Sequence, residues 1–252
     1  MKRVKSISPI IKRYDTQGSN PILIMGDDLN QWVCKYGDVQ KLFNELLAYE
    51  FAKLWDIKIP ESALIEIDYN KHVQTFSDKK GLERRFFDRE CFGSCFLEKA
   101  LDVNKSMLGN KEIVRKIKNK DDFLKISLFD IWLSNEDRNC GNYNLLLKTI
   151  EGGRGYTLFY IIDNTEIFNS STAYTQGLTD ITEQDTVLKL FTSPKTATTK
   201  KFIENLPQYD DYDELPVEDY KGCILRLGFT KETTTKPIIS ELIRQKNLDI
   251  NI

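Results

Sequence analysis

The stretch SNEDRNCGNYNLLLKTIEGGRGYTLFYIIDN, Ser134 to Asn164, decides the fold of this 252-residue chain. Residues 143–147 have the pattern of a β-strand, and residues 156–162 have the pattern of a second one. The glycines in residues 151–155 are typical of a turn between them. The stretch therefore predicts a β-hairpin of two antiparallel strands.

Three polar side chains lie at the outer ends of this hairpin. Asp137 and Asn142 flank a short polar loop before the first strand, and Asp163 follows the second strand. Because the outer ends of two antiparallel strands lie together, the hairpin should gather all three in one small volume. Phosphoryl transfer from ATP needs such a set, with one group to orient the nucleophile and oxygen ligands for Mg²⁺. The alternative is that each is an ordinary turn or helix-end residue.

Size and composition indicate a globular protein with a sizeable core. With 40% hydrophobic and 29% charged residues, the chain can form one large domain or two lobes. A net charge of −2 argues against a direct nucleic-acid partner, although a local basic patch stays open. No apolar run approaches the roughly 20 residues of a membrane span, and the basic N-terminus lacks a signal-peptide core. We therefore expect a cytoplasmic protein with no membrane partner.

The cysteines and the single histidine give no sign of a zinc site. Five cysteines are scattered along the chain, and His72 is the sole histidine. We expect reduced thiols rather than a disulfide framework. Catalysis that depends on histidine is a poor fit for this sequence.

The first half of the chain is rich in predicted strands. Short apolar runs predict strands at residues 21–25, 31–36 and 62–67, and a further apolar segment lies at 92–97. The helical spacing of leucines and phenylalanines predicts a helix at 39–55. Asp38 is suited to cap the helix. Residues 68–89 are polar and are predicted to form a loop or a small irregular insertion.

The second half is mainly helical outside the hairpin. A strongly apolar helix is predicted at residues 121–133, further helices at 183–191, 199–206 and 233–246, and a solvated acidic loop at 208–214. This order predicts an α+β, two-lobed fold with a β-rich N-lobe and a mainly helical C-lobe. We place the N-lobe at residues 1–98 and the C-lobe at residues 99–252.

A lysine and a glutamate complement the hairpin residues. Lys35 lies at the end of a predicted strand, where it can reach phosphate oxygens. Glu45 shares a small apolar helix face, and a carboxylate there needs a partner. Glu50 is the rival partner for Lys35, and we prefer Glu45 because its small neighbours let another element approach. Upstream, residues 14–20 could cover phosphates with backbone N–H groups, although they contain one glycine.

Taken together, these motifs resemble the HipA-like kinases, within the wider protein-kinase and phosphoinositide-kinase superfamily. The resemblance covers roughly residues 14 to 170 and rests on these matches: Gly18–Pro21, Lys35, Asn44–Ala48, Ile59–Pro60, Phe92–Ser94, Asp137–Asn142 and Ile161–Asp163. Three departures separate the chain from ordinary protein kinases: Asp163 is followed by Asn164 and Thr165 rather than Phe-Gly, no Ala-Pro-Glu motif follows, and no multi-glycine phosphate loop is present.

The resemblance implies a role for each matching position. Asp137 would orient or deprotonate the acceptor hydroxyl, and Asn142 with Asp163 would hold Mg²⁺. Lys35 would contact the ATP phosphates and be fixed by Glu45. The implied nucleotide contacts further include Gly18, Ser19 and Asn20 in the phosphate loop and Glu98 in the segment between the lobes.

The implied activity is an ATP- and Mg²⁺-dependent kinase that transfers the γ-phosphoryl group to a Ser or Thr hydroxyl of a protein. Autophosphorylation at Ser19 or Thr16 is one expectation, and a regulatory or antitoxin-type partner protein is another. Two alternatives stay open: a pseudokinase that acts as a nucleotide-binding interaction module, and a kinase for a small molecule or lipid.

Overall fold

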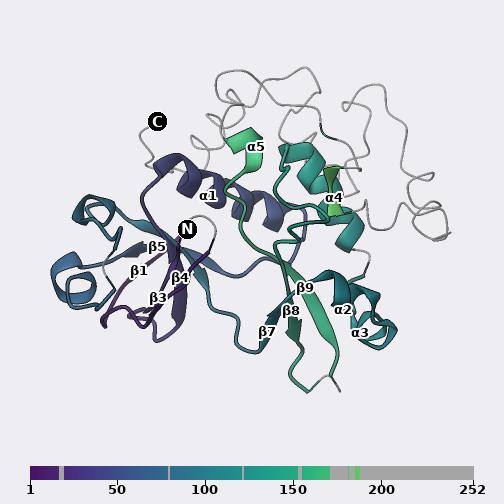
Figure 1. Ribbon diagram of the computed structural model, residues 1–252, viewed down its shortest axis with the longest axis horizontal. Helices are drawn as coiled ribbons and strands as arrows, with labels where there is room; N and C mark the ends of the chain where they lie inside the picture. The colour runs from purple at the N-terminus through teal and green to yellow at the C-terminus, as the bar shows by residue number, and fades with distance from the viewer. Residues whose placement is uncertain are drawn as a thin grey trace.

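The structure is a computed structural model that describes residues 1–16, 20–78, 80–120, 122–152, 155–170, 181 and 185–187. Two sheets and a group of helices form the α+β architecture that the sequence predicts (Figure 1). The predicted helices at 199–206 and 233–246 and the acidic loop at 208–214 lie outside the described residues, as does most of 183–191. Among the described helices, none combines the length and apolarity that a membrane span requires.

The larger sheet has six strands in the order β1-β5-β6-β4-β3-β2. Its strands are β1 (Lys2–Lys5), β2 (Lys12–Arg13), β3 (Ile22–Met25), β4 (Gln31–Lys35), β5 (Ser62–Glu66) and β6 (Cys91–Cys95). The β1–β5 pair is parallel, and the other pairs are antiparallel. Its core-facing side chains include Ile22, Trp32, Cys34 and Ile65, which have no exposed area.

The smaller sheet has three antiparallel strands in the order β7-β8-β9, with β7 at Ala100–Asp102, β8 at Leu145–Thr149 and β9 at Thr157–Ile161. The predicted hairpin is therefore present as β8 and β9, with Leu145 opposite Ile161. β8 begins two residues later than predicted. The reason is Asn144, whose φ of 45° lies in the left-handed region that a strand excludes.

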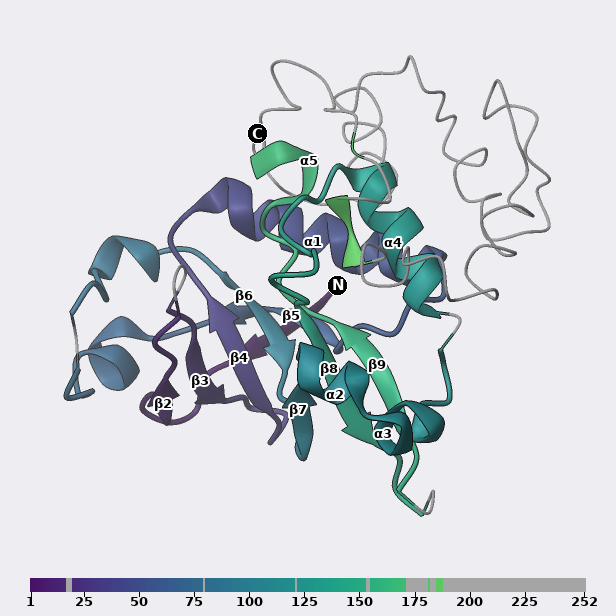
Figure 2. The ribbon, with the colours of Figure 1, turned by 45° about the vertical axis from the view of Figure 1, so that its right-hand side comes forward.

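The helices are α1 (Val39–Leu54), α2 (Lys105–Gly109), α3 (Lys111–Lys116), α4 (Asp122–Leu133) and α5 (Ile167–Ser170). Figure 2 shows α1, α4 and α5 together beside the β8–β9 hairpin, with α2 and α3 at the outer side of the smaller sheet. An apolar core joins α1, α4 and the hairpin. At its centre, Trp55 stacks on Trp132 with ring centroids 5.2 Å apart and meets Phe129 edge-on at 5.6 Å.

Some elements were not predicted. Residues 68–89, predicted to form a loop or a small irregular insertion, contain a π-helical turn η1 (Tyr69–Val73) and a 3₁₀ turn η2 (Arg84–Phe86). The carboxylate of Asp68 caps η1, and Val73 is fully buried against the larger sheet. The short elements β1, β2, β7, α2, α3 and α5 were also missed, because few residues in each carry a periodic pattern.

The close packing at the centre of the larger sheet gives a testable prediction. A Cβ atom on Gly93 in β6 would lie 2.4 Å from Cγ1 of Ile65. Gly93→Ala should therefore lower the free energy of unfolding by about 1–3 kcal/mol through overpacking. Urea denaturation followed by circular dichroism measures this change.

Gly109→Ala in α2 is the matched control, because a Cβ there would meet nothing within 4 Å. This control should leave the stability unchanged or raise it slightly. Equal stabilities for Gly93→Ala and the wild type would contradict the packing described for β5 and β6.

Candidate functional site

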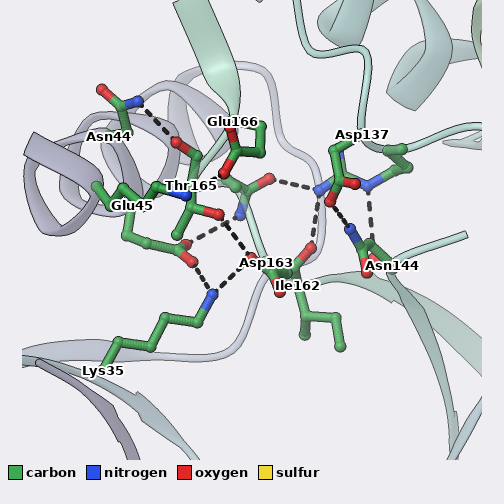
Figure 3. Close-up of polar contacts among 12 residues, drawn as sticks. Lys35, Asn44, Glu45, Asp137, Asn144, Ile162, Asp163, Thr165 and Glu166 are labelled. Carbon is green, nitrogen blue, oxygen red and sulfur yellow. Dashed lines mark hydrogen bonds and ion pairs between the residues drawn. The ribbon is translucent and has the colours of Figure 1, made fainter. Parts of the chain in front are cut away.

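Lys35 lies between two carboxylates that come from different parts of the chain. It is the last residue of β4, and Glu45 lies on the buried face of α1 with 3% of its side chain exposed. The Lys35 Nζ atom donates hydrogen bonds to Glu45 Oε1 and, at 2.6 Å, to Asp163 Oδ1 (Figure 3). α1 begins after the N-cap residue Asp38, whose carboxylate accepts hydrogen bonds from the N–H groups of Gln40 and Lys41.

The charges of this cluster stabilise one another. Burial lowers the pKa of Lys35, but the two carboxylates outweigh it, and the pKa is raised above its ordinary value. Burial likewise raises the pKa of Asp163, but the contact with Lys35 outweighs it, and the pKa is lowered. The Lys35 contribution to stability is thus lost as the pH rises through its raised pKa, and that of Asp163 as the pH falls through its lowered pKa. Lys35 and Asp163 are therefore both charged at neutral pH.

Asp163 follows the last residues of the β9 strand and has a φ of 52°. The left-handed backbone turns its carboxylate back toward Lys35, and the Thr165 hydroxyl donates to the same Oδ1 atom at 3.0 Å. The Asp163 side chain is 38% exposed, so the carboxylate also faces solvent. It can therefore contact both the buried lysine and a bound ligand.

The segment after Asp163 is fastened to α1. The Asn44 side-chain amide donates to the backbone oxygens of Thr165, at 2.8 Å, and Ile167, at 3.0 Å. Lys41 forms an ion pair with Glu166 at 2.6 Å. These contacts fix the helix that carries Glu45 relative to the strand end that carries Asp163.

Asp137 lies in the loop between α4 and β8, and both of its carboxylate oxygens are occupied. Oδ1 accepts a hydrogen bond from Asn142 Nδ2 at 3.0 Å, and Oδ2 accepts one from Asn144 Nδ2 at 2.6 Å. Because the nitrogen of the Asn142 amide faces Asp137, its oxygen is turned elsewhere. The hairpin therefore brings Asp137 and Asn142 into contact and anchors Asp163 on the neighbouring strand end.

A buried arginine joins these two halves of the site. Arg138 has no exposed area, and its guanidinium pairs with Asp130 of α4, which is equally buried. It also donates to the backbone oxygen of Ile162 at 3.0 Å and to the side chain of Asn164. The amide nitrogen of Asn164 in turn lies 3.4 Å from Glu45 Oε2. Neighbouring side chains thus connect Lys35 to α4.

The Asp130–Arg138 pair yields a stability prediction. Burial raises the pKa of Asp130 to about 7, against the attraction of Arg138. Asp130→Ala would strand a fully buried guanidinium, so the free energy of unfolding should fall by about 3–5 kcal/mol. Urea denaturation at pH 8 measures the effect.

The exposed pair Arg115–Glu112 is the control, with side chains 75% and 70% exposed. Glu112→Ala should change the stability by less than about 1 kcal/mol. Similar effects for the two substitutions would contradict the buried pairing of Arg138.

The remaining predicted residues are not part of this cluster. Gly18 and Ser19 lie outside the described residues. Asn20 has a φ of 42° and accepts a hydrogen bond on its backbone oxygen from the Tyr36 hydroxyl at 3.1 Å. Glu98 is exposed in the turn between β6 and β7.

The sequence does not predict two residues of this site, Asn144 and Asn164. Asn144 was assigned to a strand, and Asn164 was noted merely as a departure from ordinary protein kinases. Asn is one of the few residues that tolerate a left-handed backbone, and an Asn near the start of a strand pattern is a signal for that conformation. The buried state of Arg138 had no signal, since arginine is rarely buried unless it is paired.

Comparison with known proteins identifies related sequences. The family model described as HipA-like kinase matches residues 7–205, and a second model, described as NIL domain, matches residues 223–252. No solved structure matches this chain.

Curated relatives match a smaller part of the chain. The methionine import ATP-binding protein MetN of Escherichia coli strain K12 is 33% identical over 115 residues, which is 42% of this chain and 34% of MetN. MetN of Escherichia coli O157:H7 and of Shigella flexneri match with the same identity and coverage. The chain thus spans about a third of the length of these relatives.

Proposed function

We propose that this chain, which belongs to the HipA-like kinase family, transfers the γ-phosphoryl group of ATP to a Ser or Thr hydroxyl of a protein in the presence of Mg²⁺. ATP use follows from the family, and the partial relatives named MetN are also described as ATP-binding. The family indicates a kinase, and the Ser or Thr acceptor is our proposal.

The arrangement of Lys35, Glu45 and Asp163 carries the proposal. A lysine that is held by a buried glutamate and reaches a half-exposed aspartate is in the position to bind phosphate oxygens next to a metal-binding carboxylate. Lys35 remains charged at neutral pH because both partners raise its pKa. Its ammonium group therefore supplies a fixed positive charge to bind and orient phosphates.

The donor set fits Mg²⁺. Hard oxygen ligands suit this ion, and Asp163 supplies a carboxylate while Asn142 supplies an amide oxygen turned away from Asp137. When bound with ATP, Mg²⁺ would neutralise the charge that develops on the phosphoryl oxygens. Asp137 would orient the acceptor hydroxyl and receive its proton, held in place by its amide partners.

The two sheets support the proposed division into an N-lobe at residues 1–98 and a C-lobe at residues 99–252. The six-stranded sheet ends with β6 at Cys95, and the three-stranded sheet begins with β7 at Ala100. Glu98 lies in this connection. We propose that the adenine binds beside it, with Gly18, Ser19 and Asn20 covering the phosphates.

Incubation with ATP and Mg²⁺, followed by intact-mass and peptide mass spectrometry, tests the proposal. The wild type should gain phosphate on Ser or Thr, with Ser19 and Thr16 as the first sites to inspect. Asp137→Asn should lower the rate of transfer by about 10²–10⁴-fold, because the acceptor proton loses its carboxylate. Asp163→Asn should lower it at least as far and should also weaken Mg²⁺-dependent ATP binding.

Asp56→Asn is the control, since the Asp56 side chain is 89% exposed and Asn tolerates its left-handed backbone. This variant should transfer phosphate at the wild-type rate. ATP binding without transfer under any metal condition would favour the pseudokinase alternative. Phosphate found on metabolites or lipids instead of protein would favour a kinase for a small molecule or lipid.

A further inference from the structure

We propose that Asn144 is a positioning residue that holds the Asp137 carboxylate in its working orientation. The inference rests on the proposed function, because it assigns a role within the same phosphoryl-transfer site. Asn144 lies two residues beyond the motif that ends at Asn142. The role follows from three properties of Asn144: its side-chain contact, its backbone conformation and its place between two strands.

The side-chain contact of Asn144 is the shorter of the two that Asp137 accepts. Asn144 Nδ2 lies 2.6 Å from Asp137 Oδ2, whereas Asn142 Nδ2 lies 3.0 Å from Oδ1. Asn142 is exposed, and Asn144 is half-buried. Of the two amides, Asn144 therefore holds the carboxylate more firmly, and Asn142 is the one that is accessible to a metal ion.

The backbone of Asn144 is fixed by both neighbouring segments. Its carbonyl oxygen accepts hydrogen bonds from the N–H of Ile162, at 3.0 Å, and from Nε of Arg138, at 3.4 Å. Its φ of 45° aims the side chain back at the loop instead of along the strand. Asn144 thus links Asp137 to the β8–β9 hairpin; Figure 3 shows its contact with Asp137.

The chemistry explains why an amide is suited to this position. An uncharged N–H donor fixes the oxygen that it contacts without adding a second charge beside the carboxylate. A carboxylate in the place of the amide would face Asp137 as a like charge at hydrogen-bond distance. The two groups would repel each other, and Asp137 Oδ2 would lose the donor that orients it.

Two substitutions test this role through the dependence of autophosphorylation rate on ATP concentration, with Mg·ATP as the probe. Asn144→Gly keeps the left-handed backbone but removes the amide. The maximal rate should fall about ten- to a hundredfold, while the apparent KM for ATP should change less than about twofold, because a misoriented Asp137 affects chemistry and not nucleotide binding.

Asn144→Asp should reduce the maximal rate at least as far as Asn144→Gly, because it replaces the amide donor to Asp137 with a second carboxylate. The apparent KM for ATP should again change little. A residue that merely supported the fold would not lower the maximal rate and leave the KM for ATP unchanged. Asp56→Gly, at another left-handed position with a φ of 51°, is the control and should keep the wild-type rate.

A readout that needs no activity accompanies the kinetics. The side-chain amide resonance of Asn144 in ¹⁵N–¹H NMR spectra should shift in Asp137→Ala, as expected of a direct contact. The inference is overturned if Asn144→Gly keeps the wild-type maximal rate, or if its maximal rate and its ATP affinity fall together. The inference is also overturned if the side-chain amide resonance of Asn144 does not shift in Asp137→Ala. An inactive wild type would instead overturn the proposed function, even with that resonance shift intact.

Discussion

The charge of Arg138 is the constraint on which the site depends. A guanidinium without any exposed area is tolerated because Asp130, Asn164 and backbone oxygens satisfy its donors. Those partners come from α4, from the end of β9 and from the start of β8. Satisfying one cation therefore sets the relative positions of the three segments that carry Asp137 and Asp163, and geometry elsewhere in the site follows from them.

Glu45 places a second constraint of the same kind on the other side. Its carboxylate is buried on α1, and Lys35 and Asn164 satisfy its two oxygens. Asn164 is the shared partner, since it accepts from Arg138 and donates to Glu45. One amide thus joins an anion on α1 and a cation in the loop between α4 and β8, without placing any charge of its own in the interior.

Much of this arrangement could be predicted from sequence, because strand alternation and helical spacing are local signals. They gave β3, β4, α1, β5, α4 and the hairpin, and a buried carboxylate on a small apolar face pointed to Glu45 as the partner that Lys35 contacts. The polar network resisted prediction because it depends on tertiary geometry. Asn144 and Asn164 have ordinary turn-residue identities, and their contacts appear when the strand ends meet. Residues 68–89 could be predicted only as a loop or a small irregular insertion, because the two helical turns there are too short to carry a periodic pattern.

The fastening of α1 to residues 165–167 has a consequence for how the molecule fluctuates. Asn44 and Lys41 bind that segment by side chains, while Glu45 binds the adjoining Asn164. α1 cannot tilt away from the strand end without exposing a buried carboxylate and two backbone oxygens at once. Helix and strand end should accordingly open as one cooperative unit in amide hydrogen exchange, separate from the outer strands of the larger sheet. Local unfolding near Lys35 should therefore be an all-or-none event.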